Sequence, residues 1–413
     1  MDPTTSSSLE PAPPGLEKEV RRTSAALGRS FHALLASLPG LLEAGPQRQA
    51  ELLGLDKVLT SRLGRALRER GPLAFLQYCP GPEPLRRVLQ GAARLGAPAE
   101  RLAAAEAAVA DFQRLLRGTT GGRSGLDALL AGWVPAFRED YDARWRQAAF
   151  KALSQLKGVT AETNLATVLF HPSPGGERID VVWILGLLGL RRLRPGAPVK
   201  FATRRMGGEG DRRPRTLDGQ PVEDLRGLRL DRYCSADPAP LVCQAGSDVV
   251  HYTLGPTGLG LEARTDLLLA EVNPAELPRH PGGDGRRRHA FAEVGTPVRR
   301  LLFDFLLHRD LDPGVAPEVL VYDTVLEGVA DLHDPARDLD RWDLQPPVED
   351  PGPGLEALRT PEFPRYTELL EDAFRRLGWD PAAFRAWRCR LDHPPYGSQV
   401  VLALPPEAPD GGA

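Results

Sequence analysis

Residues 45–67, GPQRQAELLGLDKVLTSRLGRAL, read as two short helices joined by a glycine turn. Gly54 supplies the turn, and Asp56 is a residue type that caps the start of a helix, because its carboxylate accepts a hydrogen bond from a free backbone N–H. Ala50 is small enough to let the two helices cross closely. The buried side of the pair has apolar residues at helical spacing: Leu53, Leu55, Leu59, Leu63 and Leu67. We predict a helix-turn-helix at about residues 46–68.

This spacing resembles the DNA-binding helix-turn-helix of bacterial transcriptional regulators. In those proteins a small residue, a glycine four positions later and two apolar positions on the second helix set the crossing angle, and the matching residues here are Ala50, Gly54, Leu55 and Leu63. Thr60 departs from the pattern, since those proteins usually carry Val or Ile at that position. The resemblance covers only this short stretch. A shifted second helix, or a helical hairpin that only packs, is the alternative.

The resemblance also implies which residues contact DNA. The second helix of such a motif lies in the major groove, and outward residues near its N-terminus reach base edges. Here these are Lys57, Thr60, Ser61 and Arg62. Phosphate contacts, which position a protein without reading sequence, fall to Arg48, Gln49, Arg65 and Arg68. In the alternative, these side chains form the solvated faces of two surface helices.

Charge is distributed unevenly along the chain. The whole protein has a net charge of −3, but residues 17–70 hold ten basic and six acidic residues, a net charge of +4. Toward the C-terminus the balance reverses, with Asp331, Asp334, Asp338, Asp340, Asp343, Glu349 and Asp350. Such asymmetry is expected where one part of a protein faces a polyanion and another does not.

Composition indicates a soluble globular protein of 413 residues, with 42% hydrophobic and 26% charged residues. The longest apolar run, residues 181–190, is too short to span a bilayer. The N-terminus lacks a signal peptide, so we expect a cytoplasmic protein without a membrane partner. The four cysteines are scattered and form no C-x-x-C pair, which predicts neither disulfides nor a metal site. We expect no cofactor.

Helical patterns dominate the first part of the chain. Residues 1–15 are rich in Pro, Ser and Thr and are expected to be a disordered tail. A helical domain follows over residues 16–158, with helices at 16–38, within the motif, and at 72–78, 83–95, 98–116 and 126–156. An apolar stripe marks one face of the helix at 98–116: Ala99, Leu102, Ala105, Val109, Phe112 and Leu116. The stripe serves either internal packing or the seam of a homodimer.

Residues 159–413 read as a strand-rich domain, a sandwich or a barrel, so the fold class is α+β. The expected strands are 166–170, 181–190, 199–203, 228–233, 248–254, 265–271, 298–307, 318–324 and 399–404. A Pro-Gly turn at residues 194–197 predicts a hairpin, residues 278–288 form a basic loop suited to a mobile flap, and a late helix spans 363–386.

The motifs that suggest catalysis are weak. His308-Arg309-Asp310-Leu311 matches a protein-kinase tetrapeptide, but the other kinase elements are absent. Five histidines with nearby carboxylates could converge in a barrel as metal ligands, but they lack the spacing typical of ligands: His251, His280, His289, His308 and His333. A third interpretation is an enzyme with a pocket near Asp304, His308 and Asp310, and strand alternation puts Asp304 and His308 on one face.

The sequence therefore favours a DNA-binding transcriptional regulator. Double-stranded DNA is its expected partner, and the strand-rich domain would sense a small molecule or bind a protein. The alternative, from a different class, is a scaffold protein that binds other proteins and uses the helix pair only for packing.

Overall fold

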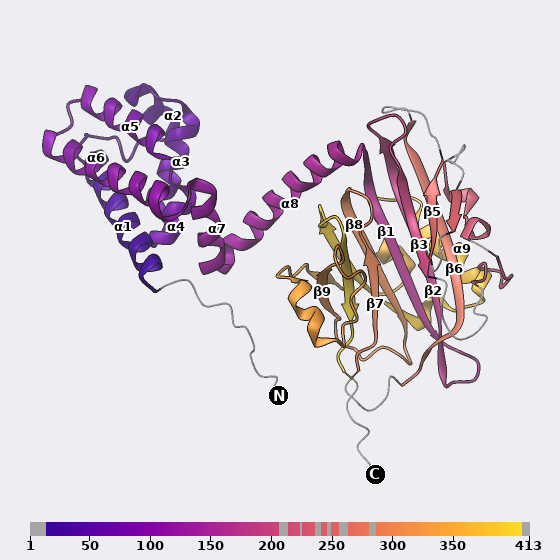
Figure 1. Ribbon diagram of the computed structural model, residues 1–413. Coiled ribbons are helices and arrows are strands. Elements are labelled where there is room, and N and C mark those ends of the chain that lie inside the picture. Colours follow the sequence, from indigo (N-terminus) through magenta and orange to yellow (C-terminus); the bar gives the residue numbers. More distant parts are fainter. Residues whose placement is uncertain are drawn as a thin grey trace, which may run out of the picture. The chain divides into compact units, whose positions relative to one another are not determined.

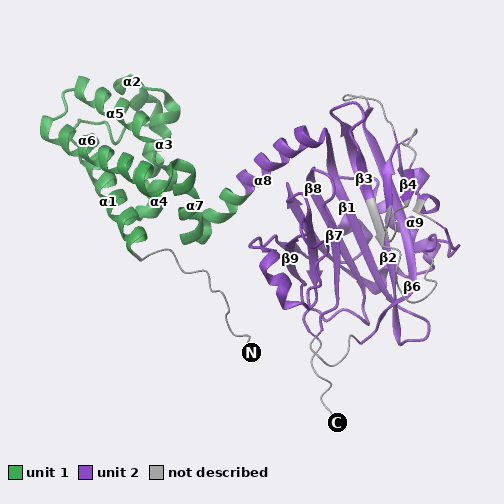
Figure 2. Cartoon of the chain, viewed as in Figure 1, with its two compact units in different colours: residues 1–142 green, residues 143–413 purple. Residues whose placement is uncertain are grey.

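The computed structural model describes residues 14–205, 214–223, 225–235, 241–245, 249–255, 263–280 and 286–406. The chain divides into two compact units, residues 1–142 and 143–413 (Figure 2). The boundary falls inside one helix, α8 (Pro135–Lys157). Helices fill the first unit and strands form most of the second, which confirms the predicted α+β class (Figure 1).

Prolines and glycines set the ends of the helices in the first unit. Its elements are α1 (Pro14–Ala36), α2 (Pro46–Leu53), α3 (Lys57–Arg68), α4 (Pro72–Tyr78), α5 (Pro82–Arg94), α6 (Ala99–Arg114), a π-helical turn (Leu115–Thr119), α7 (Arg123–Trp133) and the start of α8. Helices α2, α4 and α5 each begin at a proline preceded by a glycine. Proline suits this position because its fixed φ is helical and its missing N–H would have no partner there.

The long helix predicted at residues 126–156 is two helices, α7 and α8. Val134 separates them with φ −128° and ψ 100°, an extended conformation. The ring of Pro135 disfavours helical backbone at the residue before it, so α7 ends and α8 begins with the proline at its first turn. The prediction missed this break.

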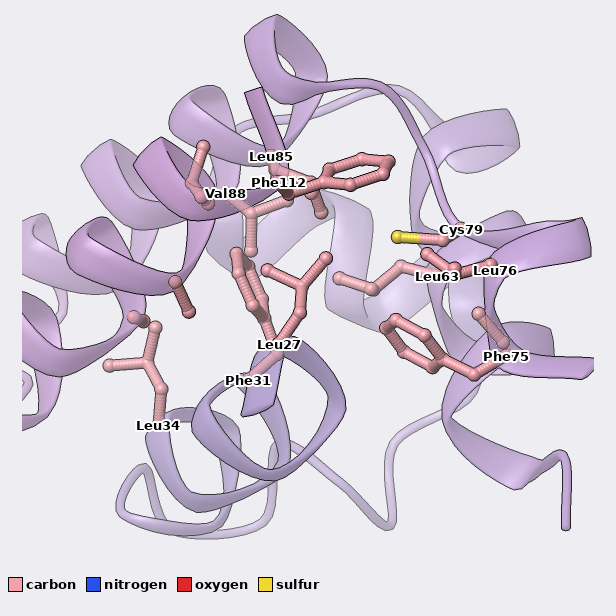
Figure 3. Close-up of a cluster of buried hydrophobic side chains, with 14 of the residues drawn as sticks. Leu27, Phe31, Leu34, Leu63, Phe75, Leu76, Cys79, Leu85, Val88 and Phe112 are labelled. Carbon is pink, nitrogen blue, oxygen red and sulfur yellow. The ribbon is translucent and has the colours of Figure 1, made fainter. Parts of the chain in front are cut away.

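One hydrophobic core holds the helical unit together. Side chains of α1, α3, α4, α5 and α6 meet in it, among them Leu27 and Phe31 of α1, Leu63 of α3, Leu76 of α4, Val88 of α5 and Phe112 of α6 (Figure 3). The apolar stripe of α6 belongs to this core, since Ala105, Val109 and Phe112 are fully buried. Packing within the unit therefore uses the face that was the candidate dimer seam.

The second unit is built from three sheets within the described residues. The largest has the order β11 (Val348–Glu349), β12 (Phe384–Asp392), β8 (Val298–His308), β1 (Val159–Pro172), β2 (Arg178–Arg192) and β6 (Thr265–Pro278). The second has the order β10 (Arg341–Trp342), β9 (Glu318–Asp323), β13 (Ser398–Ala403) and β7 (His289–Glu293). The third has the order β3 (Val199–Arg205), β5 (Val249–Leu254) and β4 (Leu241–Ala245). Strands β1 and β8 pair in parallel.

The central strands of the largest sheet are buried on both faces. On β1, Leu165 and Leu169 share a core with helix α9 (Tyr366–Leu377), whereas Val168 and Phe170 share another with the second sheet. Successive strand residues point to opposite faces, so two apolar faces require an uninterrupted apolar run. The largest sheet thus packs against the second sheet on one face and against α9 on the other, in a strand-rich unit with a late helix as predicted.

Several sequence predictions in this unit are wrong in detail. The Pro-Gly turn forms, with Gly196 at φ 69°, but it makes no hairpin because β2 pairs with β1 and β6 while β3 pairs with β5. Residues 228–233 form short 3-10 turns instead of a strand. The late helix stops at Leu377, where Gly378 takes a left-handed conformation. Part of the basic loop, residues 281–285, lies outside the described residues.

A buried polar network crosses the core under α9. The Asp304 carboxylate, fully buried on β8, accepts hydrogen bonds from Arg388 Nε (2.8 Å) and Nη2 (2.7 Å) and from the Tyr366 hydroxyl (2.7 Å). Thr167 Oγ1 lies 2.7 Å from that hydroxyl. Burial, and then the nearby Asp304 charge, raise the pKa of Tyr366 well above its usual value. The network is satisfied internally, which fits a structural role.

A second polar cluster surrounds Glu362, beside Arg300 near the start of β8. Glu362 accepts hydrogen bonds from Thr360 Oγ1 and from Arg300 Nη1. Burial alone would raise the pKa of Glu362, but these two bonds outweigh it and lower the pKa to about 2. Glu362 therefore stays ionised in the folded protein at pH values where it would be protonated in the unfolded chain.

Candidate nucleic-acid interface

Helices α2 and α3 are joined by a tight turn. Gly54 ends α2 in a left-handed conformation, with φ 63° and ψ 42°, and the N–H of Leu55 donates to the Ala50 carbonyl at 2.9 Å. A side chain at this φ would be strained, so the turn depends on glycine. Asp56 then caps α3, because its Oδ1 accepts a hydrogen bond from the Leu59 N–H at 2.8 Å. This bond lowers the pKa of the Asp56 carboxyl.

The inner face of the pair is packed as the motif requires. Ala50, Leu59, Thr60 and Leu63 are all buried. Thr60 is only 2% exposed, and its hydroxyl donates to the carbonyls of Pro46 (2.8 Å) and Lys57 (3.1 Å). The expectation that Thr60 reads bases is therefore wrong. It packs where related motifs carry an apolar residue, and its hydroxyl satisfies carbonyls at the start of both helices.

The outer face of α3 is exposed. Lys57 and Ser61 lie on it in the first two turns, and Arg68 lies on it in the last turn. Val58, which sequence reasoning did not single out, is 76% exposed beside Lys57. An exposed β-branched residue is available to contact an apolar group such as a thymine methyl.

Arg65 is exposed but held in place. Its Cζ lies 3.7 Å from the centroid of the Tyr78 ring, and its Nη2 donates to the Tyr78 hydroxyl at 2.7 Å. Stacking on an aromatic ring restricts the guanidinium and leaves other N–H groups directed outward. Tyr78 thus helps to position Arg65. The sequence did not predict this contact, because the two residues are 13 positions apart in different helices.

The Arg62 side chain is bonded to backbone carbonyls of the helical unit. Its Nε donates to the Tyr78 carbonyl at 3.0 Å and its Nη2 to the Cys79 carbonyl at 3.4 Å. Arg123 of α7 donates to the carbonyls of Leu76, Gln77 and Cys79. The two arginines thus satisfy carbonyls at the C-terminal end of α4, where the helix offers no partners of its own. Burial, and then repulsion from Arg123, lower the pKa of Arg62.

The two candidates on α2 differ from each other. Arg48 is exposed and forms an ion pair with Glu51 at 3.1 Å. Gln49 is half-buried, and its Nε2 donates to the Leu41 carbonyl at 2.9 Å, which ties α2 to the segment that precedes it. The Gln49 amide is therefore occupied by the fold, whereas the Arg48 guanidinium lies at the surface.

Arg87 of α5 also lies beside the start of α3. Its Nη2 is 3.3 Å from Asp56 Oδ2, and both side chains are about half exposed. Sequence reasoning missed Arg87 because α5 and α3 come together only through the tertiary fold. A Cβ on Gly91 of α5 would lie 2.6 Å from the Leu53 carbonyl oxygen, which shows how closely α5 approaches α2.

The predicted enzyme pocket near Asp304, His308 and Asp310 assembles only in part, since His308 Nδ1 lies 3.5 Å from Asp310 Oδ2 but Asp304 lies apart from them. Asp310 lines a cavity of about 320 Å³ together with Arg279, His280, Arg288 and Asp312. Asp304 instead lies in the core with its carboxylate bonded to Arg388 and Tyr366. Asp304 and His308 do share one face of β8, as alternation predicts, but burial keeps Asp304 away from any opening at the surface.

Four histidines of the β unit lie against other aromatic rings. His171 stacks on Trp379 with centroids 4.4 Å apart, and His308 lies 4.9 Å from His171. His289 lies 5.9 Å from His333. Within the described ranges of the chain, no three His, Cys, Asp or Glu side chains gather in a way that suits a metal ion.

A scan against models of known protein families found no match, and neither did a search of curated proteins. Among the helices of the described residues, none has both the length and the apolar character that crossing a bilayer requires.

Proposed function

We propose that the helical unit binds double-stranded DNA through the outer face of α3, and that the protein is a cytoplasmic transcriptional regulator. The observation that carries this proposal is the division of α3 into a buried face and an exposed basic face, directly after a tight turn. A helix held in this way by two neighbouring helices can enter a major groove without unfolding its support.

The contact set is narrower than the sequence alone suggests. Lys57, Val58 and Ser61 lie near the N-terminus of α3 and are the candidates for base contacts. Arg65, Arg68 and Arg48 are the candidates for phosphate contacts. Thr60 and Gln49 act within the fold, and the main role of Arg62 is to cap α4.

We further propose that the β unit senses a ligand or binds a partner for the regulator. The cavity of about 320 Å³ lined by Asp310, Arg279 and Arg288 supports a ligand, because it brings charges of both signs to one concave surface. The alternative is a scaffold protein in which the helix pair only packs. The bonds from Arg62 to the carbonyls of Tyr78 and Cys79 favour that alternative, whereas the exposed Lys57 and Arg68 favour DNA binding.

The test is fluorescence anisotropy of a labelled random-sequence duplex of about 30 base pairs, titrated with the full chain at low and at physiological salt. We expect binding that weakens steeply with salt, because phosphate contacts release counterions. The double variant Lys57→Ala/Arg68→Ala should bind more weakly and with a smaller salt dependence.

A matched control removes one lysine and one arginine elsewhere on the helical unit. Lys18→Ala/Arg101→Ala changes the net charge by the same amount at exposed positions of α1 and α6. It should bind as the wild type does. Equal losses in both variants would mean that only net charge matters, and no binding by the wild type at low salt would leave the scaffold alternative.

A further inference from the structure

Four large apolar side chains are exposed close together in sequence on the β unit. Val325 is 67% exposed, Leu326 92%, Leu339 90% and Trp342 42%. Single exposed apolar residues are ordinary on protein surfaces, but a group of them marks an interaction site. Residues 323–343, which carry this group, are called the acidic apolar surface below.

Arg337 fixes the parts of this surface beside one another. Its side chain is buried, and its Nη2 donates to the Gly328 carbonyl at 2.8 Å. Its Nε lies 2.7 Å from Asp340 Oδ2 and 3.7 Å from Glu327 Oε2. The turn that carries Leu326 and the turn that carries Leu339 are therefore joined through one guanidinium. The apolar residues are held outward by the fold.

The negative charge of the acidic apolar surface indicates the charge of its partner. Residues 323–343 hold seven carboxylates and two arginines, a net charge of −5. Asp331, Asp334 and Asp338 are exposed among them. A partner must therefore be basic and must also offer apolar contact.

The same chain carries a surface of that kind. Residues 57–70 hold five basic residues and one glutamate, a net charge of +4. On the outer face of α3, Val58 is 76% exposed between Lys57 and Ser61. This face is a short basic helix with an apolar residue, so it complements the acidic apolar surface in charge and in chemistry.

We propose that the acidic apolar surface of one molecule binds the outer face of α3 in a second copy of this chain. Each copy offers both surfaces, and in the proposed dimer the two contacts are reciprocal. This self-association goes beyond DNA binding and does not depend on it. Only one consequence rests on the proposed function: the acidic apolar surface and DNA then compete for α3.

Sedimentation velocity of the full chain tests the pairing without DNA. We expect a dimer that dissociates as salt is raised, since the contact is largely electrostatic. Two charge reversals, Lys57→Glu/Arg68→Glu on α3 and Asp331→Lys/Asp338→Lys on the acidic apolar surface, should each give monomers. An equimolar mixture of the two variants should dimerise again, because each then offers the surface that the other needs.

Recovery on mixing comes only from contact between chains, because the reversed charges are on different polypeptides. Two controls complete the experiment. Leu326→Ser changes a side chain that is 92% exposed, so the fold is kept and the dimer should weaken at least several-fold. Glu100→Lys/Glu106→Lys makes the same change of net charge on the exposed side of α6 and should leave the dimer intact. A wild-type chain that stays monomeric at about 100 µM in low salt, or a mixture that stays monomeric, would overturn the proposal.

Discussion

Replacing Arg62 by alanine separates structural from DNA-contacting arginines on α3. The Tyr78 carbonyl would lose the bond that Arg62 Nε donates to it at 3.0 Å, while the Cys79 carbonyl keeps a bond from Arg123 at 2.7 Å. The loss is therefore about one hydrogen bond from a charged donor, roughly 1.5–3 kcal/mol where it is shielded from water. Because Arg62 is partly exposed and water can replace it, we expect about 1–2 kcal/mol.

The assay is urea unfolding followed by ellipticity at 222 nm, which reports mainly on the helical unit. The free energy of unfolding comes from linear extrapolation. Arg68→Ala is the matched control, because Arg68 is exposed on the same helix and should change stability by less than about 0.5 kcal/mol. Equal unfolding midpoints for the two variants would refute the capping role of Arg62.

Three further predictions concern the turn and the polar cores. Gly54→Ala places a Cβ at φ 63° and should destabilise the helical unit by about 1–2 kcal/mol in the same urea assay. An unchanged free energy of unfolding would contradict the requirement for glycine at this turn. Asp304→Ala leaves Arg388 buried without its carboxylate and should cost about 3–5 kcal/mol in the β unit, measured by hydrogen exchange of β8 and β12. The exposed control Asp338→Ala should have no effect, and equal exchange in both would contradict this role. Glu362 has a folded pKa of about 2, below the usual 4.5, so its contribution is present above pH 4.5 and lost as the pH falls toward 2. Glu362→Gln should flatten the acid side of the stability profile, and an unchanged profile would remove Glu362 from it.

Local patterns predicted much of the fold because the physics behind them is local. The period of apolar residues located α1, α4, α5 and α6, and the left-handed glycine and the Asp56 cap fixed the turn between α2 and α3. The two-sided burial of β1 and β8 made their apolar runs long enough to read as strands.

The errors in strand assignment come from long-range packing, whereas the missed break between α7 and α8 has a local cause at Pro135. The late helix was predicted to run to residue 386, but pairing with β8 makes residues 384–392 a strand. Pro-Gly at 195–196 forms a turn, yet sheet assignment depends on β5, which lies more than 40 residues later. No local pattern indicates which strands become neighbours in a sheet.

The candidate site shows the same limit. Sequence spacing placed Lys57, Ser61 and Arg68 on α3, and the structure leaves them exposed. The spacing wrongly predicted that Thr60 faces outward. Which side of a helix is buried depends on where the partner helix lies, and Thr60 lies on the buried side. The role of Arg62 could not be predicted from the sequence either, because the carbonyls that it caps belong to α4, which meets α3 only in the folded unit.

The central claim is that the N-terminal part of α3 reads bases, and selection from a library of random duplexes tests it most directly. The wild type should enrich one sequence motif. Lys57→Ala should relax that motif at one or two positions, with a loss of about 1–3 kcal/mol of discrimination, whereas Arg68→Ala should enrich the same motif with weaker binding overall. Enrichment of no motif by the wild type, or of an identical motif by Lys57→Ala, would contradict the account.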